Sequence, residues 1–295
     1  MSSITEIKHR IASVRDTRKI TNAMYLIAST KVRKAKNDLD RTRPYFTALK
    51  KEIDRMFAAS EEMQSKYLAP EEEPDTCDGT YGVLVITADK GLAGAYNQNV
   101  LKTAQKLFNE HRDSKMFVVG EYGRQYFSHH GVPVESSFLY TAQNPTLHRA
   151  REICELLLEL YNSGKLKRIS VVYTDFAGGR TGEVNAVKLL PIDRGGIDTS
   201  QVHSTAFEYE PSVERVLDSA IHSFIAGFVY SALVDSYCCE QNARMVAMSG
   251  ADKNAEEILS DLSLQYNRVR QAAITQEITE VTAGAKSMKN NGAKR

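Results

Sequence analysis

The chain has 295 residues, of which 42% are hydrophobic and 25% are charged, and its formal net charge is +1. This balance excludes a general electrostatic attraction to nucleic acid or to a membrane surface. The four cysteines have neither CxxC nor CxxH spacing, so they indicate no zinc site or disulfide framework, and we expect reduced thiols. They are Cys77, Cys154, Cys238 and Cys239.

Residues 1–60 are predicted to form one long helix. Ser3 followed by Glu6 is a capping box, and apolar residues then recur at the spacing of a helix that pairs with another helix. Further along, the pattern shifts phase, and Pro44 could kink or restart the helix. The expected contact stripe runs through Ile4, Ile7, Ile11 and Val14, and after the shift through Ile20, Met24 and Ile27.

Residues 61–79 are acidic and contain two prolines, which predicts a linker. Residues 80–211 alternate buried-strand patterns with helical patterns, which predicts a mostly parallel sheet covered by helices on both faces. The expected strands are Val83–Ile86, Met116–Val119 and Ile169–Tyr173, with Val184–Leu190 and Val202–Tyr209 as candidate edge strands; the expected helices are Ala95–His111 and Thr146–Ser163.

Residues 212–288 are predicted to form a second long helix, and 289–295 a frayed tail. At ~1.5 Å per residue this helix would reach roughly 110 Å. Its most apolar part, between Asp218 and Asp235, falls short of the ~20 residues of a membrane span, so we expect no membrane crossing. The expected heptad positions are Leu259, Leu262, Tyr266, Val269 and Ala273, and after a phase shift Ile274, Ile278, Val281, Ala285 and Met288.

These patterns predict an α/β fold, with an antiparallel coiled coil of the long N- and C-terminal helices and a central Rossmann-like α/β domain. Glycines in the last segment leave a compact bundle of shorter helices as an alternative. They are Gly227, Gly250 and Gly284.

The stretch Val83–Val100 raises the question of a phosphate site, because a strand that passes through glycines into a helix often holds a phosphate. It lacks both the Walker lysine and the dinucleotide fingerprint. A steric turn is therefore the stronger interpretation. Of the other candidates, Gly178–Gly182 is typical of a hairpin turn, His129–His130 has no metal ligands at suitable spacing, and Asp175 lacks catalytic partners.

The N-terminal helix is basic: residues 1–58 contain fourteen Lys and Arg against six Asp and Glu. Three interpretations stay open for this charge. It could be the solvated face of a coiled coil, a nucleic-acid-binding rod, or a rod that slides against acidic protein surfaces. The cations cluster at Lys31, Arg33, Lys34 and Lys36.

Three stretches closely resemble signatures of the γ subunit of F-type ATP synthases. They are ITNAMYLIASTKVRKA (Ile20–Ala35), ITADKGLAGAYN (Ile86–Asn97) and YNRVRQAAITQEITEVTAGA (Tyr266–Ala285), in the family's order. The resemblance implies a non-catalytic rotary shaft inside a hexamer of α and β subunits, with the α/β domain packed beside ε on the membrane rotor ring, the c-ring. Rotation would couple ion flow to ATP synthesis at sites on the β subunits.

The resemblance also implies particular contacts and a location. The glycine loop that contains Lys90 would lie near an acidic moving loop of the β subunit and hold no phosphate. No cofactor and no nucleic acid is expected, and the location would be peripheral, on the cytoplasmic face of a bacterial membrane. The main alternative is a free-standing α/β nucleotide-binding enzyme with helical extensions. The expected contacts with the α and β subunits are Met24, Lys31, Arg33, Lys90, Arg270, Gln271 and Thr275.

Overall fold

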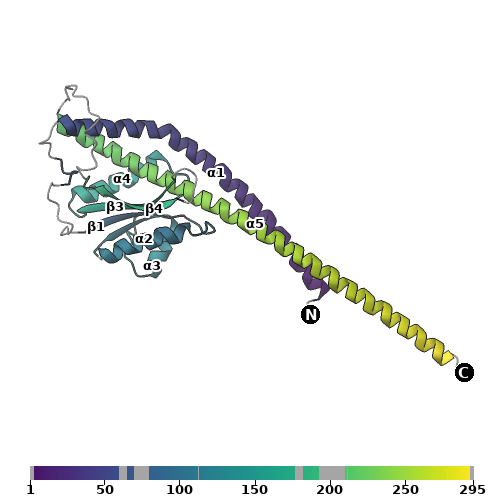
Figure 1. The fold of residues 1–295 in the computed structure, drawn as a ribbon. Coiled ribbons are helices and arrows are strands. Elements are labelled where there is room, and N and C mark those ends of the chain that lie inside the picture. Colours follow the sequence, from purple (N-terminus) through teal and green to yellow (C-terminus); the bar gives the residue numbers. More distant parts are fainter. Residues whose placement is uncertain are drawn as a thin grey trace. The chain divides into compact units, whose positions relative to one another are not determined.

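The computed structural model describes residues 3–59, 65–69, 80–111, 113–176, 182–192, 210 and 212–292. The chain divides into two compact units, a smaller one of Met1–Ile27 with Val246–Arg295 and a larger one of Ala28–Met245. Helices α1 (Ile4–Ala59) and α5 (Val213–Gly292) each contribute to both units (Figure 1). Two long terminal helices are thus confirmed, whereas the division at residues 60, 79, 211 and 288 stays a prediction.

Helix α1 begins at the predicted cap and continues without a break. The backbone N–H of Glu6 donates to Ser3 Oγ at 3.2 Å, which satisfies one of the unpaired N–H groups of the first turn. Pro44 lies inside the helix. The restart that Pro44 suggested is therefore absent.

In the smaller unit, the contact stripe of α1 keeps heptad spacing without the predicted phase shift. Steps of three and four residues from buried Ile7 lead to half-buried Arg18 and buried Thr21. The placement of Ile20 and Ile27 in the stripe is wrong, because their side chains are 61% and 56% exposed. A paired helix holds its stripe in phase even where a polar residue falls on it, since a shift would rotate every following residue out of contact.

The two helices of the smaller unit run antiparallel, as predicted. The Lys8 ammonium lies 5.7 Å from the ring centroid of Tyr266. Ten positions further along α1, Arg18 pairs with Asp252 at 3.0 Å. Residue numbers rise along one helix as they fall along the other. The predicted stripe on α5 is buried or half-buried as far as Val269.

The larger unit contains a four-stranded sheet with the order β2-β1-β3-β4. Its strands are β1 (Tyr81–Ile86), β2 (Lys115–Val119), β3 (Arg168–Asp175) and β4 (Glu183–Leu190). Strand β1 pairs in parallel with β2 and β3, and β4 pairs antiparallel with β3. The mostly parallel sheet with an edge strand is confirmed, while the candidate strand Val202–Tyr209 lies outside the described residues.

Helices cover both faces of this sheet, and alternate strand residues point to each side. Leu84 packs in a core with α4 and with parts of α1 and α5, whereas Val85 packs in a core with α2 and α3 (Figure 1). Helix α3 was not predicted from the sequence, because it has only nine residues and no long apolar period. The helices are α2 (Tyr96–Glu110), α3 (Glu121–His129) and α4 (Leu147–Asn162).

Within the larger unit, α5 is a core helix. Every residue from Ala232 to Gln241 is buried, and the ring of Phe46 from α1 packs so closely on Gly227 that an added Cβ would overlap it. Among the described residues, α5 is the helix whose length and composition alone would allow a membrane span, and half of its apolar window is buried. Such burial is typical of a helix enclosed by protein.

A short segment inside the predicted linker, Ser65–Ala69, is anchored to α5. Tyr67 is fully buried, and its hydroxyl oxygen lies 2.7 Å from Nε2 of His222. The Ser65 hydroxyl donates to Asp218 Oδ1 at 3.3 Å. The described segment Ser65–Ala69 of the predicted linker is therefore fixed to α5.

Candidate functional site

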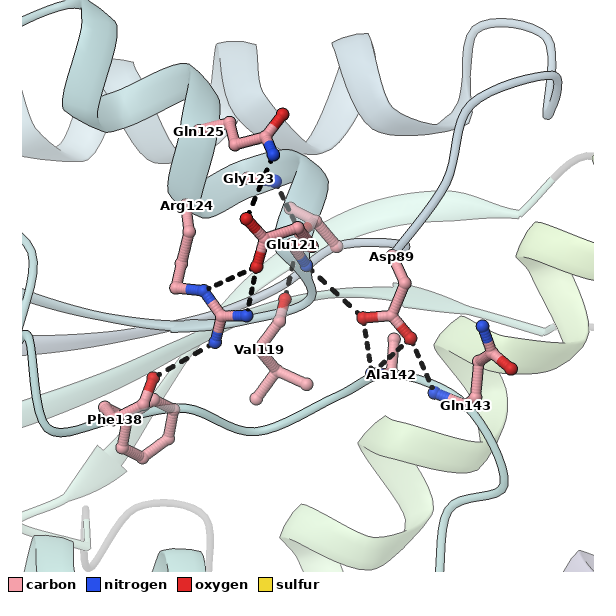
Figure 2. A network of polar contacts seen from close by, with 10 residues as sticks. Asp89, Val119, Glu121, Gly123, Arg124, Gln125, Phe138, Ala142 and Gln143 are labelled. Carbon is pink, nitrogen blue, oxygen red and sulfur yellow. Dashed lines mark hydrogen bonds and ion pairs between the residues drawn. The ribbon is translucent and has the colours of Figure 1, made fainter.

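The loop that follows β1 carries an aspartate whose carboxylate binds three backbone amides. Oδ1 of Asp89 accepts hydrogen bonds from the N–H groups of Glu121 at 3.3 Å and Ala142 at 3.1 Å. Oδ2 accepts from Ala142 and Gln143, both at 3.2 Å (Figure 2). Glu121 begins α3, where unpaired N–H groups and the helix dipole favour an anion. The carboxylate thus takes the kind of position that a phosphate takes at a helix N-terminus.

Side chains also fix the strand ends next to this loop. The Thr87 hydroxyl donates to the carbonyl of Val119 at 2.9 Å and accepts from the N–H of Gly123 at 3.1 Å. The side-chain oxygen of Asn97 accepts from the N–H of Ala88 at 3.0 Å. The loop is therefore bonded to β2, to α3 and to the first turn of α2.

The network continues along α3 to the loop after it. Hydrogen bonding from Arg124 is the main cause of a lowered pKa of the Glu121 carboxyl group. Arg124 Nη1 also donates to the carbonyl of Phe138 at 3.4 Å, and the Gln125 amide donates to Glu121 at 3.0 Å (Figure 2). The first turn of α3 therefore organises two loops at the carboxyl ends of the strands.

Arg244 of α5 holds the other side of the glycine loop. Its guanidinium donates to the carbonyl oxygens of Gly91 at 3.0 Å and Lys90 at 3.4 Å, and to Oε1 of Glu240 at 2.6 Å. Glu240 is only 4% exposed. Burial raises the pKa of this carboxyl group, and the charge of Arg244 opposes the rise. Removing Arg244 would leave the buried Glu240 carboxylate with only the smaller effect of the Lys31 charge.

The described residues leave little space at the crevice in which open α/β sheets bind ligands. That crevice lies at the carboxyl ends of neighbouring strands whose connections leave in opposite directions, here β1 and β3. A cavity of about 90 Å³ remains there, lined among others by Tyr96, Thr174 and Asn242. Small-molecule sites usually occupy ~300–1,000 Å³. The described residues therefore favour the steric-turn interpretation of the loop over nucleotide binding.

The remaining sequence candidates form no described reaction centre. His129 and His130 are exposed, and Nδ1 of each lies close to a carbonyl oxygen of its own helix. Among the described residues, no group of three His, Cys, Asp or Glu side chains could hold a metal ion. Asp175 lies near Asp235, whose pKa is raised to about 6, mainly by burial and then by this like charge. The loop Gly178–Gly182, except for its last residue, lies outside the described part.

Three cysteines are free and buried, as expected for reduced thiols: Cys154, Cys238 and Cys239. Burial is the main cause that raises the pKa of each thiol to about 12. A thiol with so high a pKa is a poor nucleophile at neutral pH. Cys77 lies outside the described residues.

Three of the predicted partner contacts belong to the larger unit. Arg33 and Lys90 are exposed, whereas Lys31 is half-buried. Lys31 lies near buried Glu240, where its charge acts with that of Arg244 against the effect of burial on the pKa. The structure thus brings Lys31 and the Lys90 backbone to one buried ion pair and leaves Arg33 outside it.

The other four predicted contacts belong to the smaller unit. Met24 is half-buried in the helix pair. Arg270, Gln271 and Thr275 are exposed on α5, just after the last stripe residue. The Thr275 hydroxyl donates to the carbonyl of Gln271 at 2.9 Å, so it is bonded within its own helix. These three side chains lie on a part of α5 that no described residue of α1 covers.

The same part of α5 exposes an apolar stripe. All described side chains from residue 270 to 285 are exposed, including Ala273, which was wrongly predicted to continue the paired stripe. Ile274, Ile278 and Val281 are 46%, 62% and 69% exposed and recur at helical spacing. Exposed apolar residues on one helical face are typical of an interaction site. The predicted second stripe exists, and none of the residues that the structure describes covers it.

The residues that fix the glycine loop were not predicted from the sequence. Asp89 stands within the quoted motif, and only the fold reveals that it binds amides more than thirty residues away. Glu240 and Arg244 have a detectable signal, because they are four residues apart, at the spacing of a helical ion pair. That pair follows the most apolar part of α5, where an isolated charge would be costly.

The described chain combines an antiparallel pair of long helices with an α/β unit built on a mostly parallel sheet. A family model described as ATP synthase matches residues 3–288. A protein named ATP synthase gamma chain from Caldanaerobacter subterraneus subsp. tengcongensis is 41% identical over 291 residues, covering 95% of this chain and 98% of the relative. The chain therefore belongs to the ATP synthase gamma chain family.

Further relatives and solved structures agree with this assignment. A gamma chain named sodium ion specific, from Acetobacterium woodii, is 34% identical and covers 97% of this chain and 99% of the relative. A chain in the Euglena gracilis mitochondrial ATP synthase has a TM-score of 0.67 at 16% identity and covers 97% of this chain and 94% of that chain. A chain of the Tetrahymena thermophila central stalk and c-ring has a TM-score of 0.55 at 22% identity and covers 79% and 99%. These two structures support the fold.

Proposed function

We propose that the chain is the central-stalk rotor subunit of a bacterial F-type ATP synthase. Its helix pair turns inside a hexamer of α and β subunits, whose catalytic sites lie on β. The α/β unit rests with ε on the c-ring, at the cytoplasmic face of the membrane. The chain itself catalyses no reaction and couples ion flow to ATP synthesis by rotation.

One observation carries this proposal beyond family membership. Helix α5 continues past Val269 as an exposed helix with Ile274, Ile278 and Val281 on its surface. Exposure of these apolar side chains to water is unfavourable, so the helix is stabilised when a surrounding protein buries them. A ring of subunits around this segment would provide that burial. The polar side chains beside the stripe, Arg270 among them, would then contact the ring.

The test replaces Arg270 in the reassembled complex and measures ATP-driven ion pumping together with ATP hydrolysis. Partly exposed ion pairs contribute only ~0.2–1 kcal/mol. Arg270→Ala should therefore reduce pumping per ATP moderately, and Arg270→Glu should reduce it more because repulsion replaces attraction. Arg268→Ala is the matched control, since Arg268 is an equally exposed arginine two residues away on the same helix.

The proposal assumes that many weak contacts act together and that no single one is catalytic. A loss of all hydrolysis in a fully assembled Arg270→Ala complex would contradict this and require a catalytic role for this arginine. Removing two or three of Lys31, Arg33, Arg270 and Gln271 together should be worse than any single change. The partners are identified by tagging the chain and purifying it from its own membranes. Recovery without α, β, ε or c subunits would refute the proposed assembly.

A further inference from the structure

A groove of about 480 Å³ lies on the α2 face of the sheet, between the C-terminal end of α2 and the β3–β4 half. Its floor includes Tyr81, Ser170 and Ala186, and its cations are Arg168 and Lys188. The volume falls in the usual range of ligand sites, ~300–1,000 Å³. The groove lies at the opposite end of β1 from the glycine loop, since Tyr81 begins that strand.

The strand register explains why the sheet is hollow here. Ser170 pairs with Val83 on one side and with Lys188 on the other. The side chains of Ser170 and Ala186 are small, and α2 ends before it covers them. Ala186 is therefore exposed, although it lies within a strand.

The most informative side chain of the groove is Arg168. Its guanidinium carbon lies 5.8 Å from the ring centroid of Tyr81, within cation–π distance. Tyr81 is only 8% exposed and stacks on His111, with centroids 4.2 Å apart and planes 10° apart. The stacked rings of Tyr81 and His111 support the guanidinium of Arg168 and leave its N–H groups available for a planar acceptor.

The acidic side chain of the groove does not neutralise this arginine. Glu110 pairs with Lys106 at 3.8 Å on its own helix. Within the described residues, no carboxylate lies at ion-pair distance from Arg168. Arg168 therefore presents a supported cation in a groove whose floor is made of neutral side chains.

We propose that this groove binds an acidic peptide segment of a partner protein, with Arg168 holding a carboxylate through two parallel hydrogen bonds. The planar fork of arginine matches a carboxylate in this way. Lys188 lines the β4 side of the groove.

The test uses the purified full chain and a fluorescent peptide of alternating Glu and Ala with blocked ends, at physiological salt. We expect saturable binding that Arg168→Glu weakens at least about tenfold. The matched control Lys102→Glu, an exposed lysine of α2 outside the groove lining, should weaken it less than about twofold, as expected of a distant screened charge. Arg168→Lys keeps the charge without the fork and should give an intermediate loss.

A second variant tests the groove without changing its charge. Ala186→Phe fills the floor and should block the peptide, while circular dichroism confirms that both groove variants fold. No saturable binding, equal weakening by Arg168→Glu and Lys102→Glu, or undiminished binding to Ala186→Phe would each overturn the proposal. Displacement of the peptide by ATP at stoichiometric concentration would also overturn it, in favour of a nucleotide. None of these results depends on rotation, so the rotor function is tested separately.

Discussion

Replacing Ile7 by aspartate should detach the start of α1 from α5, whereas the same replacement at Ile20 should not. The two isoleucines lie on one helix, but Ile7 is 4% exposed and Ile20 is 61% exposed. The pair therefore tests the phase of the helix contact with one chemical change. It separates the stripe in the structure from the apolar pattern that the sequence alone suggests.

The magnitude follows from burial. Losing a buried isoleucine side chain costs about 1.5–3 kcal/mol, and placing an unpaired polar group there costs about 1–3 kcal/mol more. An aspartate near a helix N-terminus recovers about 0.3–1 kcal/mol from the dipole, so the net loss at Ile7 is about 1.5–6 kcal/mol. At the exposed Ile20 the change should stay within about 0.5 kcal/mol.

Hydrogen exchange of the purified chain measures this loss locally. Amides of residues 7–14 should exchange at least about tenfold faster in Ile7→Asp, since each factor of ten corresponds to about 1.4 kcal/mol. Ile20→Asp should change them less than about threefold. Equal acceleration by both variants, or a larger effect of Ile20→Asp, would refute the assigned phase and restore the shifted pattern.

Three further predictions concern the larger unit. The pKa of Asp235 in the folded chain is raised from 3.8 to about 6. Its favourable contribution to the free energy of unfolding is therefore complete below pH ~4 and is lost as the pH rises to ~6, a difference of about 3 kcal/mol. Asp235→Asn should remove this part of the pH dependence in urea unfolding, and an unchanged slope would contradict it. Tyr67→Phe should lose about 1 kcal/mol with its contact to His222, seen as faster exchange at residues 65–69. Gly227→Ala should cost about 1–3 kcal/mol by overlap with Phe46, and Phe46→Leu should restore part of it; additive losses would contradict the overlap.

Regular periodicity made the outline of the fold predictable. The strands were predicted correctly because parallel strands that are buried on both faces have continuous apolar sequences, as in Val83–Ile86. The long helices were found because nothing in α5 forced a break. Short α3 was missed because its nine residues are too few for a period to show. The stripe of α1 was wrongly extended through Ile20, because this apolar residue was taken as a contact residue. In a paired helix, the heptad spacing decides which residues face the partner.

The details of the site could not be read in this way. Asp89 bonds to amides 32 and more positions further along the chain, and no local pattern encodes such a pairing. The resemblance supplied the partner contacts instead, and these stay predictions. Arg270 is exposed in the structure, so its side chain is accessible to a partner.

The carboxylate of Asp89 has a consequence for how the subunit responds to its surroundings. In a nucleotide-binding fold, the anion at such a loop belongs to the bound ligand. Here the anion is covalently part of the chain, so the loop is held in the same way at every ATP concentration. Its conformation is set by the polypeptide alone.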